Sequence, residues 1–356
     1  MQRTIQNQAV AGRGWMLQGA WSDVTSTRTD CRISVNSGCG SESDELGFLV
    51  LADGKSLCEP CGGFDEVEEA EVTRESPVLL KFGASQEYTL RLASTEEDRL
   101  RCWHLVYREY LALGYATAQE LPYRYSIHDA LPEAMTLLVE KDGVAIGTVT
   151  GFPDSALGLP ADAIYRDELD AMRRAGRRVM EVGRFTIDHA HQNQRQVLTS
   201  LMDILTIYAR RVWGATDFVI TVNPSHVKYY ERMLLFKKQG ELKSLDSVQG
   251  APAVLLALDL ALEERIRRYA HGEGPKPEEY DGGRMLHQHS SNQEQEEAHA
   301  ARLRQVCRRP EATFLRRYFV WVKPLIAALP QEARQLFEGW YPGLMDDRLV
   351  REVGAA

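Results

Sequence analysis

The sequence predicts a mixed α/β fold, in which helices flank a central mixed sheet. Three observations favour this class. Apolar residues alternate along several short segments, an Asp-Gly turn separates two of those segments, and helical stripes fall between the others. With 356 residues, the chain is long enough for two or three structural units, of which at least one can bury a large core.

Composition limits the possible functions. The formal net charge is -9, and residues 1 to 80 alone hold 13 acidic against 6 basic side chains. We expect this segment to be an acidic, loosely ordered arm or a small module. The overall acidity disfavours nucleic-acid binding. No apolar run approaches the ~20 residues of a membrane span, so we expect a cytoplasmic protein.

The predicted fold opens with a strand and a helix. Tyr88, Leu90 and Leu92 alternate as in a half-buried strand. A capping-box pattern at Ser94 then starts a helix, and Gly114 ends it.

A hairpin follows in the sequence. Its two strands are Met135 to Glu140 and Val144 to Thr150, and Asp142-Gly143 separates them. This dipeptide accepts the positive φ angles of a tight turn, so the two strands should pair antiparallel.

Six more elements complete the predicted domain, which spans residues 87 to 260. In order they are a helix at 162 to 176, a strand at 179 to 187, a core helix at 197 to 212, a strand at 218 to 222, a helix at 225 to 234 and a strand at 252 to 258. Residues 261 to 356 form a C-terminal extension with a polar linker at 271 to 298 and terminal helices.

Two motifs and the element order carry a family resemblance. The segment Ile187 to Val197 stands where GNAT acyltransferases have their phosphate loop, and Asn223-Pro224-Ser225-His226 with Tyr230 and Phe236 resembles their second signature. The strand Glu181-Val182-Gly183-Arg184-Phe185 resembles that of acyl-homoserine-lactone synthases. Residues 87 to 260 look most like the FeeM-like N-acyl amino acid synthases, a GNAT branch related to those lactone synthases.

The resemblance implies an activity. Enzymes of this branch transfer a long acyl chain from the phosphopantetheine thioester of acyl carrier protein to the α-amine of an amino acid. It therefore implies no permanently bound cofactor, with the carrier protein and the amino acid as partners. The acylated product could also bring the enzyme to a membrane surface. The alternatives are a coenzyme A-dependent N-acetyltransferase and an inactive GNAT-fold binding module.

The departure from the usual phosphate loop favours a carrier-protein donor. In coenzyme A-dependent enzymes, two glycines let backbone amides approach a pyrophosphate. Arg195 and Val197 occupy those positions here, and we expect their side chains to hold a pyrophosphate away. Side chains can meet the single phosphate of a carrier-protein pantetheine instead. The candidate donor-binding residues are Gln192, Arg195, Gln196 and Asn223.

Amide formation from a thioester requires proton removal from the amine and a partner for the leaving thiolate. Glu181 is the candidate base, unless it forms a structural ion pair with an arginine such as Arg184. Strand alternation would place Glu181, Phe185 and Ile187 on one face. Tyr230 matches the GNAT tyrosine at the thiolate, with Tyr229 as competitor. His226 either assists catalysis or caps its helix.

Three residues are candidates for binding the acceptor amino acid. Arg184 either holds its carboxylate or serves as a structural counter-ion. Arg124 and Asp129 lie in a polar, aromatic loop that either binds the amino acid or is tied down by its own polar groups.

An acidic carrier protein needs a basic docking surface. The predicted surface consists of Arg195, Arg210, Arg211, Lys228, Arg232, Lys237 and Lys238, with Arg173, Arg174, Arg177 and Arg178 as a second cluster. No metal site is predicted. Six cysteines are too few for a disulfide scaffold in a chain of this length, so we expect reduced thiols. Cys58 and Cys61 form a Cys-Glu-Pro-Cys pair, but Cys31 and Cys39 are spaced more widely than in usual zinc knuckles, so a structural zinc at these four residues is only an alternative.

Overall fold

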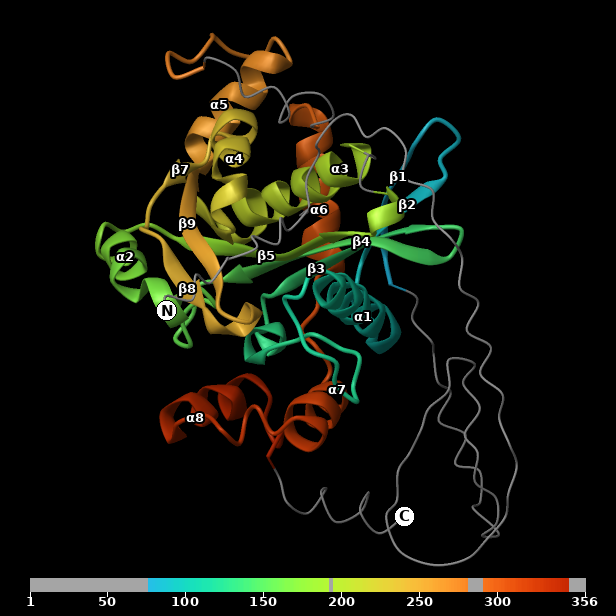
Figure 1. Cartoon of the computed structure of the whole chain (residues 1–356). Coiled ribbons are helices and arrows are strands. Elements are labelled where there is room, and N and C mark those ends of the chain that lie inside the picture. The colour runs from blue at the N-terminus through green and yellow to red at the C-terminus, as the bar shows by residue number, and fades with distance from the viewer. Residues whose placement is uncertain (1–75, 192–194, 281–290, 346–356) are drawn as a thin grey trace, which may run out of the picture. The chain divides into compact units, whose positions relative to one another are not determined.

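A computed structural model describes residues 76–191, 195–280 and 291–345 (Figure 1). The strands are β1 (Val78–Phe82), β2 (Tyr88–Leu92), β3 (Met135–Lys141), β4 (Val144–Pro153), β5 (Val179–Ile187), β6 (Asp217–Val222), β7 (Lys237–Lys238), β8 (Lys243–Leu245) and β9 (Ala251–Asp259). The α-helices are α1 (Glu96–Ala112), α2 (Asp162–Arg174), α3 (Arg195–Ile207), α4 (Val227–Leu234), α5 (Leu260–Ala270), α6 (Gln293–Val306), α7 (Ala312–Leu315) and α8 (Gln331–Trp340). Short helical turns occur at η1 (Ile127–Ala130), η2 (His189–His191), η3 (Tyr208–Trp213), η4 (Pro224–His226), η5 (Asp246–Val248) and η6 (Arg316–Val322).

The described strands form one mixed sheet with the order β1-β2-β3-β4-β5-β6-β9-β7, and β8 pairs with β9. Only the β5–β6 pair is parallel among these strand pairs. The element order confirms the predicted GNAT-like arrangement. The β3–β4 hairpin is also confirmed, with Asp142 at φ 50° and Gly143 at φ 75° in its turn. Strand β1 was missed, because its short segment follows the acidic arm without a clear alternating pattern.

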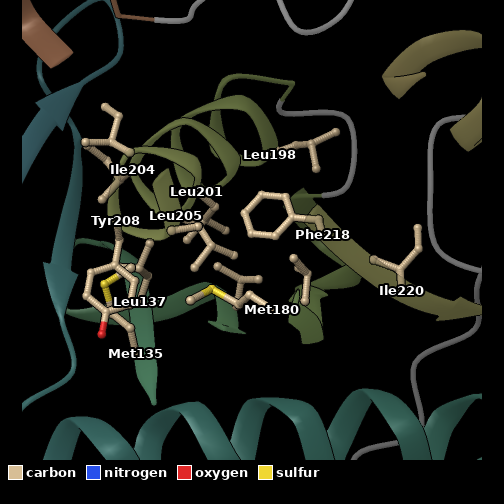
Figure 2. Packing of buried hydrophobic residues seen from close by; sticks show 14 of the residues in the cluster. Met135, Leu137, Met180, Leu198, Leu201, Ile204, Leu205, Tyr208, Phe218 and Ile220 are labelled. Atoms are coloured by element: carbon tan, nitrogen blue, oxygen red, sulfur yellow. The ribbon is translucent and has the colours of Figure 1, made fainter. Parts of the chain in front are cut away.

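Helices cover both faces of the sheet. Helix α3 lies on one face, where Leu201 and Leu205 pack against Met180 and Leu137 (Figure 2). Helix α6 extends this core through Ala300 and Leu303. Helices α1 and α2 cover the other face: Cys102 packs on Leu138, and Tyr165 packs on Val179 and Val219. In Figure 1, α1 and α3 accordingly lie on opposite sides of the strands.

The sheet opens between its two central strands. β5 and β6 pair only from Val179 opposite Asp217 to Glu181 opposite Val219. Beyond this point β5 continues along β4, and β6 continues along β9. The two parallel strands therefore diverge and leave a fork between them. The fork is bordered by β5 from Val182 onward and by β6 from Ile220 onward.

A β-bulge interrupts β5 within this fork. Thr148 pairs with Thr186 and Thr150 pairs with Gly183, so Arg184 and Phe185 together face one residue of β4. Arg184 has a φ of 52°, the left-handed region that non-glycine residues rarely adopt. The bulge reverses the alternation: Val182 and Ile187 both join the core under α3. The expectation that Glu181 and Ile187 share a face is therefore wrong.

The C-terminal helices pack on α1 and on the loop that follows it. Trp103 and Tyr125 share one buried cluster with Phe314, Phe319 and Phe337 of the extension. The Tyr125 hydroxyl donates to the Tyr318 carbonyl at 2.8 Å. The described part of the extension thus supports the loop at residues 121–131. The division of the chain into three parts stays a prediction.

A buried ionic network ties α3, α5 and α6 together. Arg267 pairs with Asp203 at 2.6 Å and with Glu263 at 2.9 Å, and Arg210 reaches Glu263 and Glu296 at 3.3 and 3.1 Å. The Arg210 side chain is only 5% exposed. The sequence predicted Arg210 on the docking surface, and this is wrong. Its side chain belongs to the interior, because buried carboxylates pair with its charge. No helix in the described residues is long and apolar enough to cross a membrane.

Candidate active site

The fork between β5 and β6 opens into a cavity of about 520 Å³. Its walls come from both faces of the sheet. Leu198 and Met202 of α3 line one side, while Tyr110 of α1 and Tyr125 line the other. The cavity therefore passes through the sheet and gives two molecules access to one point from opposite faces.

Glu181 stands at the apex of the fork and is 6% exposed. One of its carboxylate oxygens accepts a hydrogen bond from the Ala161 backbone N–H at 2.7 Å. Burial raises the pKa of Glu181 to about 8, against the smaller lowering effects of this bond and of Arg184. Among the described residues Glu181 forms no ion pair. Its carboxyl group is thus poised to exchange a proton near neutral pH.

Arg184 projects from the bulge and pairs with Asp129 at 2.6 Å. It also donates to the Ser126 hydroxyl at 2.9 Å and to the Arg124 carbonyl at 3.1 Å. Its Nε atom is buried without a hydrogen-bond partner in the described structure. The guanidinium is therefore held in place from one side and keeps one donor for a ligand in the cavity.

Asp129 serves as the partner of Arg184. Its second oxygen accepts from the Trp103 indole at 3.3 Å, and the first also accepts from the Ser126 backbone and hydroxyl. The Asp129 side chain is 1% exposed and does not line the cavity. Because its acceptor positions are occupied by the protein, Asp129 orients Arg184 and does not itself contact the contents of the cavity.

Tyr230, His226 and Asn223 line the cavity from the chain that follows β6. Burial raises the pKa of Tyr230, so its hydroxyl stays protonated. Burial lowers the pKa of His226, whose side chain makes no capping hydrogen bond. The Asn223 oxygen caps η4 by accepting from the Ser225 backbone at 3.1 Å. Tyr229 does not line the cavity.

Two of the predicted phosphate-loop residues, Arg195 and Gln196, do not line the cavity. Arg195 and Gln196 are exposed at the start of α3, and Gln192 lies outside the described residues. Val197 is fully buried, and its side chain packs closely over Gly147. The expectation that Val197 holds a pyrophosphate away is therefore wrong, because its side chain is buried in the core. Arg195 is exposed at the first residue of α3.

Several cations of the predicted docking surface are already paired. Arg211 binds Glu264 and Glu296, and Lys238 binds Glu241. In the second cluster, Arg173 contacts three aspartates and Arg177 contacts Asp217. In the first cluster, four exposed cations have no ion pair among the described residues, and we call them the donor rim: Arg195, Lys228, Arg232 and Lys237.

The structure adds a cavity residue, His128, to which the sequence assigned no role. His128 lines the cavity beside Phe152, and burial lowers its pKa to about 4, so its ring is neutral. Phe152 packs over Gly183, where a Cβ atom would come within 2.9 Å of the ring. The only signal for His128 was its place in the polar, aromatic loop.

No strong metal site emerges from the described part of the chain. Glu109, Asp188 and His189 come close enough to hold an ion. Arg108, however, contacts both carboxylates and already supplies the positive charge that a metal would bring. The four cysteines of the N-terminal arm lie outside the described residues.

Comparison with known proteins gives the following matches. The family described as N-acyl amino acid synthase FeeM matches residues 101–259. The chain is similar to the solved structure of FeeM from uncultured soil microbes, with 29% identity and a TM-score of 0.43, over 49% of this chain and 92% of that one. It is similar to the AHL synthase LasI, with 15% identity and a TM-score of 0.37, over 49% of this chain and 90% of that one.

A third similar structure is an acyl-CoA N-acyltransferase from Pseudomonas aeruginosa, with 16% identity and a TM-score of 0.34, over 48% of this chain and 97% of that one. No curated protein matches the chain. Every described residue that lines the cavity, from Tyr110 to Ala253, lies inside the matched region. The chain is thus an acyltransferase whose residues 101–259 match the family of N-acyl amino acid synthase FeeM.

Proposed function

We propose that the cavity joins the α-amine of an amino acid to a long acyl chain delivered as an acyl-carrier-protein thioester. The observation that carries this proposal is the position of Glu181. It is the only carboxyl group among the described residues lining the cavity, and it stands where β5 and β6 separate. A thioester entering from the α3 face and an amine entering from the α1 face would meet there.

Glu181 acts in this scheme as the general base. Its pKa of about 8 matches the unperturbed pKa of an α-amine, which is near ~8. A base and an acid of similar pKa exchange a proton readily, and such matching is typical of catalytic carboxyl groups. Glu181 therefore takes a proton from the attacking amine, directly or through one water molecule.

The bulge and Tyr230 stabilise the thioester oxygen and the leaving sulfur, respectively. A bulge leaves backbone groups out of the ladder, so the N–H groups of Arg184 and Phe185 are candidate donors to the thioester oxyanion. As the new C–N bond forms and the C–S bond breaks, the sulfur takes a proton from the Tyr230 hydroxyl and leaves as a thiol. The proton held by Glu181 returns to the tyrosine through water.

Arg184 binds the carboxylate of the acceptor. Its Nε atom has no hydrogen-bond partner in the described structure, while Asp129 and Ser126 bind the Nη2 atom of the guanidinium. A held carboxylate places the neighbouring amine at a constant distance from Glu181. The proposal thus assigns a positioning role to Asp129 and a binding role to Arg184.

The carrier protein docks on the donor rim. Carrier proteins are strongly acidic, and four exposed cations near the start of α3 and along α4 to β7 lack ion pairs within the described ranges. Arg195 is the cation nearest to the first turn of α3, where the helix dipole also favours a phosphate.

The test incubates the purified full chain with long-chain acyl-carrier protein and the twenty amino acids, and mass spectrometry searches for N-acyl products. Parallel reactions contain the matching acyl-coenzyme A. We expect products mainly from the carrier protein, and their loss with Tyr230→Phe but not with Tyr229→Phe. Equal use of acyl-coenzyme A would assign the coenzyme A-dependent alternative. The absence of product from both donors would favour an inactive binding module.

A further inference from the structure

A third cation joins Arg124 and Arg184 from outside the family-matched region. Lys323 follows η6 in the C-terminal extension, and its Nζ atom lies 4.4 Å from the centre of the Tyr125 ring. Tyr125 lines the cavity, and its ring stacks on Trp103 at 4.2 Å. Because an indole occupies one face of the ring, Lys323 lies on the opposite face.

The three cations surround a short stretch of chain. Arg184 reaches the carbonyl of Arg124 and the hydroxyl of Ser126, and so spans Tyr125, on whose ring Lys323 lies. The Arg124 guanidinium lies 4.8 Å from the centre of the Tyr110 ring and donates to the Ser247 carbonyl. We call Arg124, Arg184, Lys323 and Asp129 the acceptor charge cluster.

This cluster has more positive than negative charge. Asp129 is its only carboxylate, and that carboxylate is committed to Arg184, Ser126 and Trp103. Arg124 and Lys323 have aromatic rings and a carbonyl as partners, but no carboxylate in the described part of the chain. Three cations against one carboxylate leave two positive charges in a partly buried place.

Uncompensated buried charge is unfavourable, and an anionic ligand relieves it. Burial lowers the pKa of both Arg124 and Lys323, because removal from water disfavours their charged forms. The α-carboxylate of a neutral amino acid would compensate one of the two charges. A second negative group in the same molecule would compensate the other.

We propose that the preferred acceptor is an α-amino dicarboxylic acid, whose side-chain carboxylate binds between Arg124 and Lys323. This inference rests on the proposed function, in which Arg184 binds the α-carboxylate. Lys323 is then a specificity residue that the C-terminal extension supplies beside Tyr125, which lines the cavity of the family-matched domain. The phosphate of the donor is no competitor, because it binds at the α3 side of the sheet.

The experiment measures kcat/KM for aspartate, glutamate, asparagine and glutamine with saturating acyl-carrier protein. Four proteins are compared: wild type, Lys323→Gln, Lys323→Arg and the control Lys141→Gln. Lys141 also lies over a tyrosine, 5.2 Å from the ring centre of Tyr88, but that tyrosine, unlike Tyr125, does not line the cavity. Thermal shift with each free amino acid gives a readout independent of turnover.

We expect the wild type to favour the dicarboxylic acids over their amides by roughly 10- to 100-fold in kcat/KM, as the loss of a charge-assisted buried hydrogen bond implies. Lys323→Gln should remove most of this preference through KM and leave the amides unaffected. Lys323→Arg should restore part of it, and Lys141→Gln should change nothing. The dicarboxylic acids should likewise raise the melting temperature of wild type more than that of Lys323→Gln.

Two results would overturn the inference and leave the proposed function intact. One is a wild type that acylates amides as well as acids. The other is a Lys323→Gln variant that loses activity equally on all four acceptors, which would indicate a structural role. A wild type that acylates no amino acid at all, yet is stabilised by the dicarboxylic acids, would instead contradict the proposed function alone.

Discussion

The two sides of the cavity carry their positive charge differently. On the acceptor side, Arg184 is 12% exposed and is fixed by Asp129, whose side chain is 1% exposed. On the donor rim, Arg195 and Lys237 are exposed and have no ion pair among the described residues. The acceptor side therefore holds a few partly buried charges that are fixed by ion pairs and hydrogen bonds. The donor rim presents several exposed charges to water.

The difference separates two kinds of recognition. Charges in a low effective dielectric interact strongly and are screened little by salt, so they can select one small molecule. Exposed charges are individually weak and act together over a Debye length of ~8 Å at physiological ionic strength. We therefore expect large effects that are insensitive to salt on the acceptor side, and small, additive, salt-sensitive effects on the donor rim.

The largest effect is expected at Glu181, where the two sides meet. Glu181→Gln should lower turnover by ~10² to 10⁴, the range of a lost general base. The fold should persist, because the amide oxygen of glutamine can still accept from the Ala161 N–H. Single-turnover rates with circular dichroism of the folded variant check this. Unchanged turnover would remove Glu181 from the mechanism, and Glu241→Gln, an exposed carboxyl outside the cavity lining, serves as control.

The same residue predicts a pH dependence. The pKa of Glu181 is raised from 4.5 to about 8 in the folded protein, so the basic form, and with it the rate, should increase as the pH rises through about 8. The free energy of unfolding should change in the opposite direction and decrease as the pH rises. The folded state favours the protonated carboxyl group, so its contribution is complete below pH 4.5 and is lost as the pH rises towards 8. Glu181→Gln should lack this loss in denaturant titrations across that interval.

The next effect tests the rigid side. Asp129→Asn leaves Arg184 buried without its counter-ion, which should lower the free energy of unfolding by about 3 to 5 kcal/mol. The double variant Asp129→Asn/Arg184→Gln should recover part of that loss, because it also removes the buried guanidinium that Asp129 had paired. Chemical denaturation of both variants measures the coupling. Equal stability of wild type and Asp129→Asn would show that the ion pair does not organise this side.

A smaller effect is expected on the donor rim. Lys237→Glu should raise KM for acyl-carrier protein a few-fold at low salt and have no effect on a small pantetheine thioester. The increase should shrink as salt rises. Arg210→Glu is the contrasting change: it should destabilise the fold, because Arg210 binds buried Glu263 and Glu296. If Lys237→Glu has no effect at any salt concentration, the carrier protein does not dock on this rim.

The smallest effect is expected from deleting the arm. A chain that starts at Ser76 should retain acyl transfer, because Tyr110 is the first of the described residues that line the cavity. The deletion must stop there, since the Ser76 hydroxyl accepts from the backbone N–H groups of Ser94 and Thr95 at the start of α1. Assays of the truncated protein measure turnover and melting temperature. Loss of turnover in a folded truncated protein would show that the arm completes the site.

What the sequence by itself determined is the local part of the architecture. Periodicity, capping and turn chemistry depend on neighbouring residues, so the β3–β4 hairpin and helices α1 and α3 could be predicted within a few residues. The candidacy of Glu181 and Tyr230 came from a family pattern around them, and both line the cavity. Gln196 and Arg195 do not line it, although the same pattern pointed to them.

Only the tertiary structure decided which charges are free and which faces the strands present. The bulge at Arg184 depends on the register with β4 and reverses the alternation that a regular strand would keep. Arg210 is buried because α5 and α6 bring carboxylates to it from 53 and 86 residues away in sequence. Lys323 meets Tyr125 only because the C-terminal helices pack on α1. Local sequence patterns contain no information on such partners, since the energy of a charge depends on what folding places around it.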